Sequence, residues 1–154
     1  MTESPRQFLK PSAVERTFNR VFGWIVGLGL GMRHNYLLQV KGRKSGKTYS
    51  TPVNVLNHNG RLFLVAPRGE TQWVRNARAQ GHVALKKGWS TAPFTVRELQ
   101  DPEKPEILKA YLDSFKTTVQ RYFTVQAGSP VEAFAAVAGM YPVFELLPSR
   151  DPKA

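Results

Sequence analysis

Short apolar runs separated by turn signals are the feature that most constrains the fold of this chain. Six such runs predict strands at residues 36–40, 49–56, 61–66, 82–87, 93–99 and 141–147. The second and third runs are joined by residues 57–60, and the Asn-Gly pair ending that segment is typical of a tight hairpin turn. Because most of the strands follow one another along the chain, we expect an antiparallel, barrel-like sheet.

Apolar residues at helical spacing predict four helices around these strands, at residues 11–25, 70–80, 102–123 and 129–138. In the longest, the apolar positions from Ile107 to Val119 lie on one face. Thr71 and Asp101 are suited to begin the helices that follow them, because their side-chain oxygens accept hydrogen bonds from free N–H groups. The sequence therefore predicts an α+β protein, a six-stranded, mostly antiparallel barrel flanked by helices.

The first 32 residues differ in character from the remainder, and we expect a separate N-terminal segment, 1–32, before a domain at residues 33–154. Residues 21–32 carry no charge, but as a helix they extend only about 18 Å, short of a hydrocarbon core of about 30 Å. Residues 11–33 therefore either pack on the domain as a helix or lie on a membrane surface. No signal-peptide pattern is present, so we expect a cytoplasmic protein, with membrane contact limited to the surface.

The positive charge of the chain is concentrated in its middle. The formal net charge is +11, and residues 33–97 hold twelve Lys and Arg but one acid, Glu70. Such a field attracts phosphates, polycarboxylates, nucleic acid or anionic lipid, although a solvated basic face would give the same counts. The absence of Cys excludes disulfides and thiolate chemistry. The three histidines have no carboxylate at ligand spacing, so we expect no metal site.

Two segments of this basic region carry residues suited to a ring that bears a phosphate. In residues 42–48, two glycines bend the backbone, and Arg43, Lys44 and Ser45 add charge and a hydroxyl donor, as phosphate recognition requires. Further on, Trp73 and Asn76 lie at i and i+3, which places an indole and an amide on one helix face. The alternatives are a plain basic loop, and a core tryptophan beside a surface asparagine.

Three motifs, in this order, make the chain similar to a known family: Gly-Arg-Lys-Ser-Gly at residues 42–46 followed by Thr51-Pro52-Val53, the turn Ala66-Pro67-Arg68-Gly69, and Trp73-x-x-Asn76. The chain resembles the deazaflavin (F420)-dependent nitroreductase family, split β-barrel oxidoreductases, over residues 36–99 and 141–148. The resemblance implies that Arg43, Lys44 and Ser45 hold the phosphate and acidic tail of F420. It also implies that the deazaflavin ring is bordered by Thr51, Pro52, Val53, Ala66, Pro67, Arg68, Gly69, Trp73 and Asn76.

Members of that family pass a hydride from C5 of the reduced coenzyme to the acceptor, so the resemblance implies no catalytic acid–base pair. Asn54, Tyr122 and Tyr141 are the candidates for the acceptor side, where a tyrosine could supply the accompanying proton. Asn54 and Pro67 stand where quinone- and nitro-reducing members tend to have an aromatic residue and a serine. The expected acceptor is therefore an apolar molecule, with quinone-like, enone and lipid-like compounds all left open.

Other functions fit the same residues. FMN could occupy the barrel in place of F420, or the chain could carry a cofactor or lipid without turnover. A nucleic-acid-binding module is a weaker alternative, since the aromatic side chains of the basic region are few, and we expect no nucleic-acid partner. The oligomeric state is open, with a dimer among the candidates.

Overall fold

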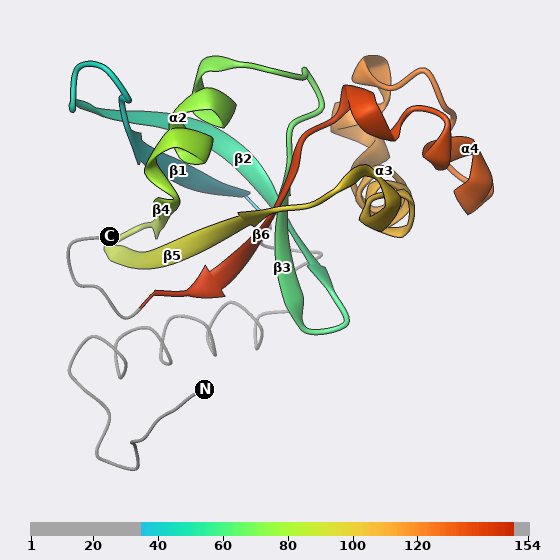
Figure 1. The fold of residues 1–154 in the computed structure, drawn as a ribbon. Helices are drawn as coiled ribbons and strands as arrows, with labels where there is room; N and C mark the ends of the chain where they lie inside the picture. The colour runs from blue at the N-terminus through green and yellow to red at the C-terminus, as the bar shows by residue number, and fades with distance from the viewer. Residues whose placement is uncertain (1–34, 150–154) are drawn as a thin grey trace, which may run out of the picture.

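The computed structural model describes residues 35–149, and its six strands close into a barrel (Figure 1). The strands are β1 (Asn35–Lys41), β2 (Thr48–His58), β3 (Arg61–Val65), β4 (His82–Lys87), β5 (Ser90–Glu98) and β6 (Val143–Pro148). Around the barrel they follow the order β1-β2-β3-β6-β5-β4, and every pair is antiparallel. The predicted α+β class and antiparallel barrel are therefore confirmed.

Side chains alternate between the interior of the barrel and its outer face, and β3 is buried on both. Leu62 and Leu64 belong to the core inside the barrel. Phe63 and Val65 belong to a second core, which the helices cover on the outside. Because successive side chains of a strand point to opposite faces, this double burial explains the nearly continuous apolar run at residues 61–65.

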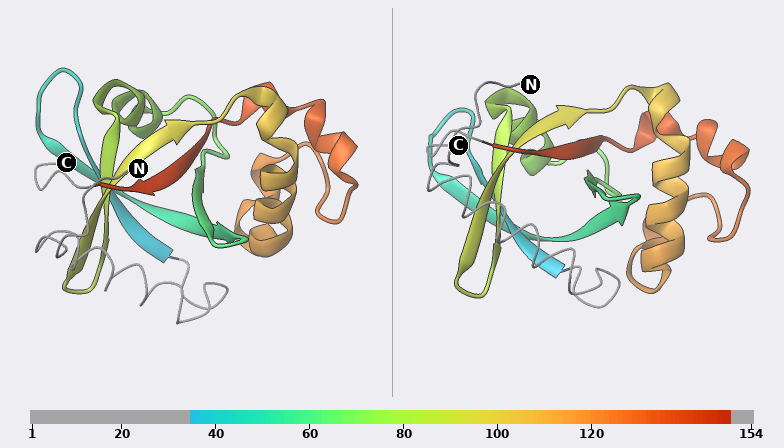
Figure 2. Two further views of the ribbon diagram at one scale, coloured as in Figure 1. Left: turned by 60° about the horizontal axis from the view of Figure 1, so that its bottom comes forward. Right: turned by 90° about the horizontal axis from the view of Figure 1, so that it is seen from below.

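The helices cover two parts of the barrel (Figures 1 and 2). α2 (Gln72–Gln80) packs over one end, where Val74 and Ala77 join the interior core. α3 (Pro105–Val119) and α4 (Val131–Ala135) lie together beside the barrel, near the hairpin between β2 and β3. The second core fills the space between α3, α4 and the barrel wall.

The predicted helices around residues 102–123 and 129–138 are shorter in the structure and flanked by 3-10 turns. α3 lies between η1 (Asp101–Glu103) and η2 (Gln120–Tyr122), and α4 is followed by η3 (Ala138–Met140). The backbone of α3 leaves helical geometry at Phe115, with φ −121° and ψ 26°. Continuous apolar spacing along the sequence therefore overestimated the length of both helices.

The expected helix caps also differ. Thr71 precedes α2, but its side chain makes no capping hydrogen bond. The N-terminus of η1 is stabilised by a capping box of Gln100 and Glu103, in which the Gln100 N–H donates to the Glu103 carboxylate at 2.8 Å. With that role filled, the Asp101 carboxylate forms an ion pair with the Lys104 ammonium at 2.8 Å.

Some predictions fall on residues that the structure does not describe. These are the helix at 11–25, the division into segments 1–32 and 33–154, and membrane contact through residues 11–33. They stay predictions. Between residues 35 and 149, no helix is both long enough and apolar enough to cross a membrane.

Candidate functional site

A cavity of about 930 Å³ lies between the β1–β2 turn, the middle of β2, the β3–α2 loop, α2 and the C-terminal part of α3. Its lining includes most of the residues that the sequence predicted: Arg43, Lys44, Ser45, Thr51, Pro52, Val53, Asn54, Ala66, Pro67, Arg68, Trp73, Asn76 and Tyr122. Predicted residues as far apart as Arg43 and Tyr122, which are separated by 79 positions, thus border one space. Its volume lies within the range of about 300–1,000 Å³ that is usual for ligand sites.

The β1–β2 turn forms one wall of the cavity and is held by its own hydrogen bonds. The Gly42 N–H donates to the Lys47 carbonyl at 2.7 Å, and the Gly46 N–H donates to the Gly42 carbonyl at 3.0 Å. Ser45 Oγ accepts from the Lys47 N–H at 3.2 Å and lies 3.3 Å from the Tyr49 hydroxyl. A Cβ at Gly42 would lie 2.7 Å from both Ser45 Oγ and a Tyr49 ring carbon, so a side chain at this position would require both exposed side chains to move.

Two side chains of α2 fix Arg43 at this turn. Oδ1 of the buried Asn76 accepts hydrogen bonds from the Arg43 backbone N–H at 3.0 Å and from its guanidinium at 2.7 Å. The same guanidinium donates to Gln72 Oε1 at 3.0 Å. The resemblance implies that Asn76 borders the ring; in the structure its carbonyl oxygen is hydrogen-bonded to Arg43.

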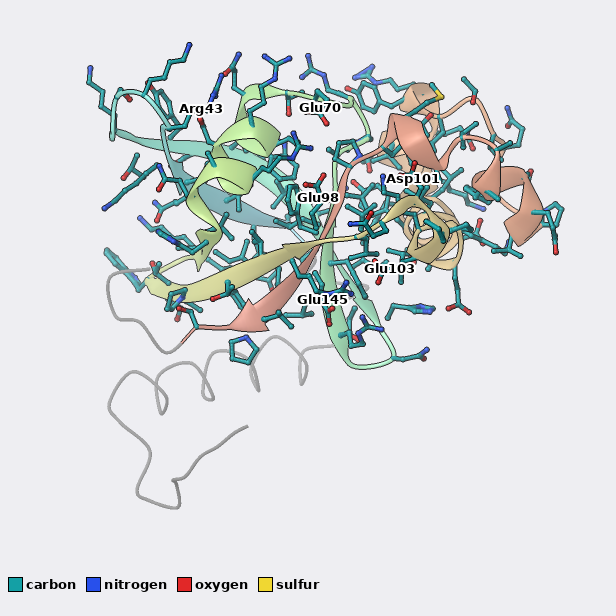
Figure 3. The ribbon with its side chains drawn as sticks, in the orientation of Figure 1. Arg43, Glu70, Glu98, Asp101, Glu103 and Glu145 are labelled. Atoms are coloured by element: carbon teal, nitrogen blue, oxygen red, sulfur yellow. The ribbon has the colours of Figure 1, made fainter. Side chains whose placement is uncertain are left out.

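The cations at the cavity differ from three arginines of the basic region that are paired with carboxylates. Within residues 35–149, Arg43, Lys44 and Arg68 have no carboxylate partner. Figure 3 shows Arg43 at the barrel end near α2, apart from Glu98, Glu103 and Glu145 along and after β5 and on β6. The cavity therefore carries positive charge that the described part of the protein does not neutralise.

Three other arginines of the basic region are paired with carboxylates. Arg61 and Arg97 donate to Glu145 at 2.8 and 3.1 Å, and the Arg61 hydrogen bond is the main cause of the lowered pKa of that carboxyl. Arg78 donates to Glu70 and Glu98 at 2.8 and 2.7 Å, which raises the pKa of its guanidinium. These arginines hold strands and loops together, so the counts along the sequence overstated the charge that is left for a ligand.

Apolar residues form another part of the lining. Trp73 is half-buried, and its ring packs on Phe144 with centroids 5.9 Å apart. The buried Ala66 is held by its N–H, which donates to the Pro142 carbonyl at 2.9 Å. Gly69 does not line the cavity; it turns the β3–α2 loop with φ +85°, a conformation that favours glycine.

The opposite end of the cavity contains Tyr111, which sequence analysis did not select. Tyr111 lies on α3, is 2% exposed and lines the cavity beside Asn54. Burial raises the pKa of its phenol to about 12, while a hydrogen bond with the Asn54 side chain acts in the lowering direction. Its place in an apolar helical stripe looked like that of a core residue, so no local signal distinguished it.

The two predicted tyrosines of the acceptor side lie in different surroundings. Tyr122 lines the cavity and is exposed. Tyr141 does not line it; its ring stacks on Phe123 with centroids 4.4 Å apart, and its hydroxyl donates to the Tyr122 carbonyl at 3.2 Å. Tyr141 is thus placed to support the backbone at Tyr122. The remaining lining residues that sequence analysis did not select include Asn35, Gln72, Thr118 and Val119.

A closed antiparallel barrel with a cation-lined cavity beside an indole is the arrangement that the resemblance to split-barrel flavin and deazaflavin oxidoreductases implies. The comparisons with known proteins narrow this class. Residues 13–130 match the family model of the F420H(2)-dependent quinone reductases, and the chain belongs to this family. It is therefore an F420H2-dependent reductase, as the resemblance implied. A search of curated proteins gave no match.

Solved structures share the barrel at low sequence identity. An F420-H2 dependent reductase is 24% identical, with 74% of this chain and 94% of that chain covered and a TM-score of 0.50. A structure described as a domain-swapped dimer is 22% identical, with 83% and 95% covered and a TM-score of 0.53. A putative pyridoxamine 5′-phosphate oxidase from Listeria innocua is 12% identical, with 84% and 94% covered and a TM-score of 0.56. At these identities the likeness shows the fold alone.

Proposed function

We propose that this protein reduces a quinone in the cavity, with F420H2 held at the β1–β2 turn and the quinone at the α3 end. One observation carries the proposal. One side of a single cavity carries Arg43, Lys44 and Arg68, which have no carboxylate partner within residues 35–149. Another side carries the hydrogen-bonded pair of Tyr111 and Asn54. A phosphate-bearing donor and a carbonyl acceptor need these two chemistries in one place.

The residues present fit the coenzyme. The phosphodiester and glutamates of F420 are anions, and charge-assisted hydrogen bonds from Arg and Lys suit them. Arg43 is already oriented by Asn76 and Gln72, so little side-chain freedom is lost on binding. Thr71, in the same wall, has a hydroxyl with no hydrogen-bond partner within residues 35–149.

The apolar part of the lining is the proposed place of the ring. Trp73, Pro52 and Ala66 offer flat or small apolar surfaces along one side of the cavity. When bound, the reduced coenzyme supplies the hydride from C5. The work left to these residues is to orient the ring toward the acceptor and to exclude water from the space between them.

On the acceptor side, Tyr111 is the proposed donor to a quinone oxygen. Reduction of a quinone to a quinol takes up one hydride and one proton, and negative charge develops on oxygen as the hydride arrives. With a pKa of about 12, the Tyr111 phenol is protonated at neutral pH and can donate a hydrogen bond to that oxygen. Tyr122, near the outside of the cavity, would contact the remainder of the acceptor.

The experiment that tests this proposal has a binding step and a turnover step. The purified protein is titrated separately with F420 and FMN under fluorescence, and the complex with F420H2 is then mixed with a panel of quinones and enones. We expect F420 to bind more tightly than FMN and quinones to oxidise the bound F420H2 in a single turnover. Tighter binding of FMN would overturn the cofactor assignment, and binding without oxidation would indicate a carrier. Light scattering of the same sample tests whether the chain forms a dimer.

A further inference from the structure

The turn between β4 and β5 exposes a complete tryptophan side chain. Trp89 has a relative exposure of 103%, compared with 53% for Met140 and 51% for Tyr49, the next most exposed large apolar side chains within residues 35–149. Figure 2 shows the β4–β5 hairpin as a narrow projection from the barrel. A large ring at the end of a projection contributes no burial to this fold.

The geometry of the turn does not explain the tryptophan. Lys87 pairs with Ser90, so Gly88 and Trp89 form a two-residue hairpin loop. Gly88 has φ +58°, and glycine at the first loop position is what this kind of turn requires. The second position accepts small polar residues equally well. The indole at this position therefore points to a partner outside the chain.

The charge around the indole indicates the chemistry of that partner. Lys86 is exposed and has no carboxylate partner among the described residues, and Lys87 follows it. No Asp or Glu occurs between residues 82 and 97. Tryptophan favours the region between lipid headgroups and acyl chains, and lysines beside it are attracted to anionic headgroups.

We infer that the β4–β5 hairpin docks on an anionic lipid surface, with Trp89 inserted at the headgroup level and Lys86 against lipid phosphates. A protein groove would suit the indole, but the hairpin offers few other apolar atoms to fill one, since residues 88–91 are otherwise small or polar and exposed. A nucleic acid would use the lysines, yet it would need further aromatic side chains beside Trp89 for stacking.

The docking tip is connected to the cavity wall. Lys86 pairs with Leu37 of β1, and the Lys87 ammonium donates to the Asn35 carbonyl at 2.9 Å. Asn35 lines the cavity and pairs with Asn54 of β2. Docking through the tip would therefore hold the Asn54 side of the cavity near the lipid, where apolar molecules dissolve.

Flotation with lipid vesicles tests this inference on the full chain. The protein is mixed with vesicles of phosphatidylcholine alone or of phosphatidylcholine with phosphatidylglycerol, and the bound fraction is measured. We expect binding only to the anionic vesicles, reduced about ten-fold by Trp89→Ser and about five-fold by Lys86→Gln. Met140→Ser and Lys116→Gln, matched changes of an exposed apolar and an exposed basic residue, should leave the binding unchanged.

A second measurement locates the indole. Vesicles with brominated acyl chains should quench the tryptophan fluorescence of the wild-type protein more than that of Trp89→Ser. A thermal unfolding curve like that of the wild type would show that the variant is folded. Absence of wild-type binding, or equal binding by Trp89→Ser, would overturn the inference. The inference would also be overturned if Trp89→Ser lost binding to oligonucleotides while its binding to vesicles was unchanged. Neither assay uses F420 or a quinone, so failure of docking and failure of the proposed reductase activity are distinguishable.

Discussion

A single oxygen atom of Asn76 accepts both the backbone N–H and the guanidinium of Arg43, at 3.0 and 2.7 Å. Asn76 is buried in α2, whereas Arg43 lies in the β1–β2 turn, 33 positions earlier. The helix therefore sets the position of both the turn and its cation. Asn76 is therefore a positioning residue for the proposed anion site, independently of whether its amide touches the coenzyme.

Replacement of Asn76 should weaken F420 binding through Arg43. Hydrogen bonds to charged groups contribute about 1.5–3 kcal/mol, so Asn76→Ala and Arg43→Ala should each raise the Kd for F420 by about 10- to 100-fold. Because the two residues act together, the double variant should lose less than the sum of the two free-energy changes. Fluorescence titration measures all three. Lys116→Ala, an exposed basic residue of α3, is the matched control, and additive losses would contradict the coupling.

Gly42→Ala should disturb the packing of the β1–β2 turn. The added Cβ would meet Ser45 Oγ and the Tyr49 ring at 2.7 Å, so these two exposed side chains must move from their places in the turn. We expect a lower melting temperature and weaker F420 binding, measured by thermal unfolding and titration. Gly60→Ala is the control, because φ is +83° there but no atom lies within 4 Å of a Cβ. It should lower stability by about 1 kcal/mol through backbone strain and leave binding unchanged.

Tyr111→Phe should slow turnover without weakening coenzyme binding. Removal of the phenol takes away the proposed donor to the quinone oxygen, and loss of such a donor typically slows a reaction by about 10²-fold or more. The Kd for F420 should stay the same, because the proposed coenzyme contacts lie at the β1–β2 turn and α2. Since the pKa of this phenol is about 12, the phenol stays protonated from neutral to mildly alkaline pH, and its deprotonation should not reduce wild-type turnover in that range.

Tyr141→Phe is the matched control for this experiment. The Tyr141 hydroxyl donates to the Tyr122 carbonyl and does not line the cavity, so its removal should cost stability, about 1 kcal/mol, with little effect on turnover. Equal turnover in Tyr111→Phe and the wild type would exclude Tyr111 as the donor. A large loss in Tyr141→Phe would assign that role to Tyr141 instead.

Glu145→Gln should change the dependence of stability on pH. The folded protein lowers the pKa of this carboxyl, first through its hydrogen bond from Arg61 and then through that from Arg97. A depressed pKa stabilises the folded state above the unfolded pKa of about 4.3, and the stabilisation is lost as the pH falls through the lower folded value.

At pH 7, Glu145→Gln should therefore reduce the free energy of unfolding by about 1–3 kcal/mol, as expected for lost hydrogen bonds between charged groups. The difference from the wild type should shrink as the pH drops below about 4. Urea unfolding at several pH values measures both. Glu132→Gln, on the exposed side of α4, should show neither effect, and a pH-independent difference at Glu145 would contradict the assignment.

The sequence predicted the strands well because a strand is a local pattern. The run at 61–66 and the Asn-Gly turn before it became β3 and its hairpin, with Asn59 and Gly60 both at positive φ. The three motifs around Arg43, Ala66 and Trp73 also came together at one cavity. Side-chain partners were less predictable, because Asn76 and Arg43 meet only through the packing of α2 on β1.

Two failures of sequence reasoning have a common physical cause. Tyr111 looked like a core residue because helical spacing shows which face is apolar, but not which point of that face borders a cavity. The basic region looked uniformly available to a ligand because charge counts do not show pairing. In the structure, Arg97 is paired with Glu103 and Glu145, both beyond the end of that region. Only the closed barrel brings β5 and β6 side by side.

The double burial of β3 has a consequence for how substitutions act. Leu62 and Leu64 pack with the barrel that carries the cation-bearing turn, while Phe63 and Val65 pack with α3, which carries Tyr111. Substitutions in the outer layer could tilt or rotate α3 while the inner layer keeps its shape. Substitutions in the outer layer should therefore change the proposed acceptor end of the cavity more than the proposed coenzyme end.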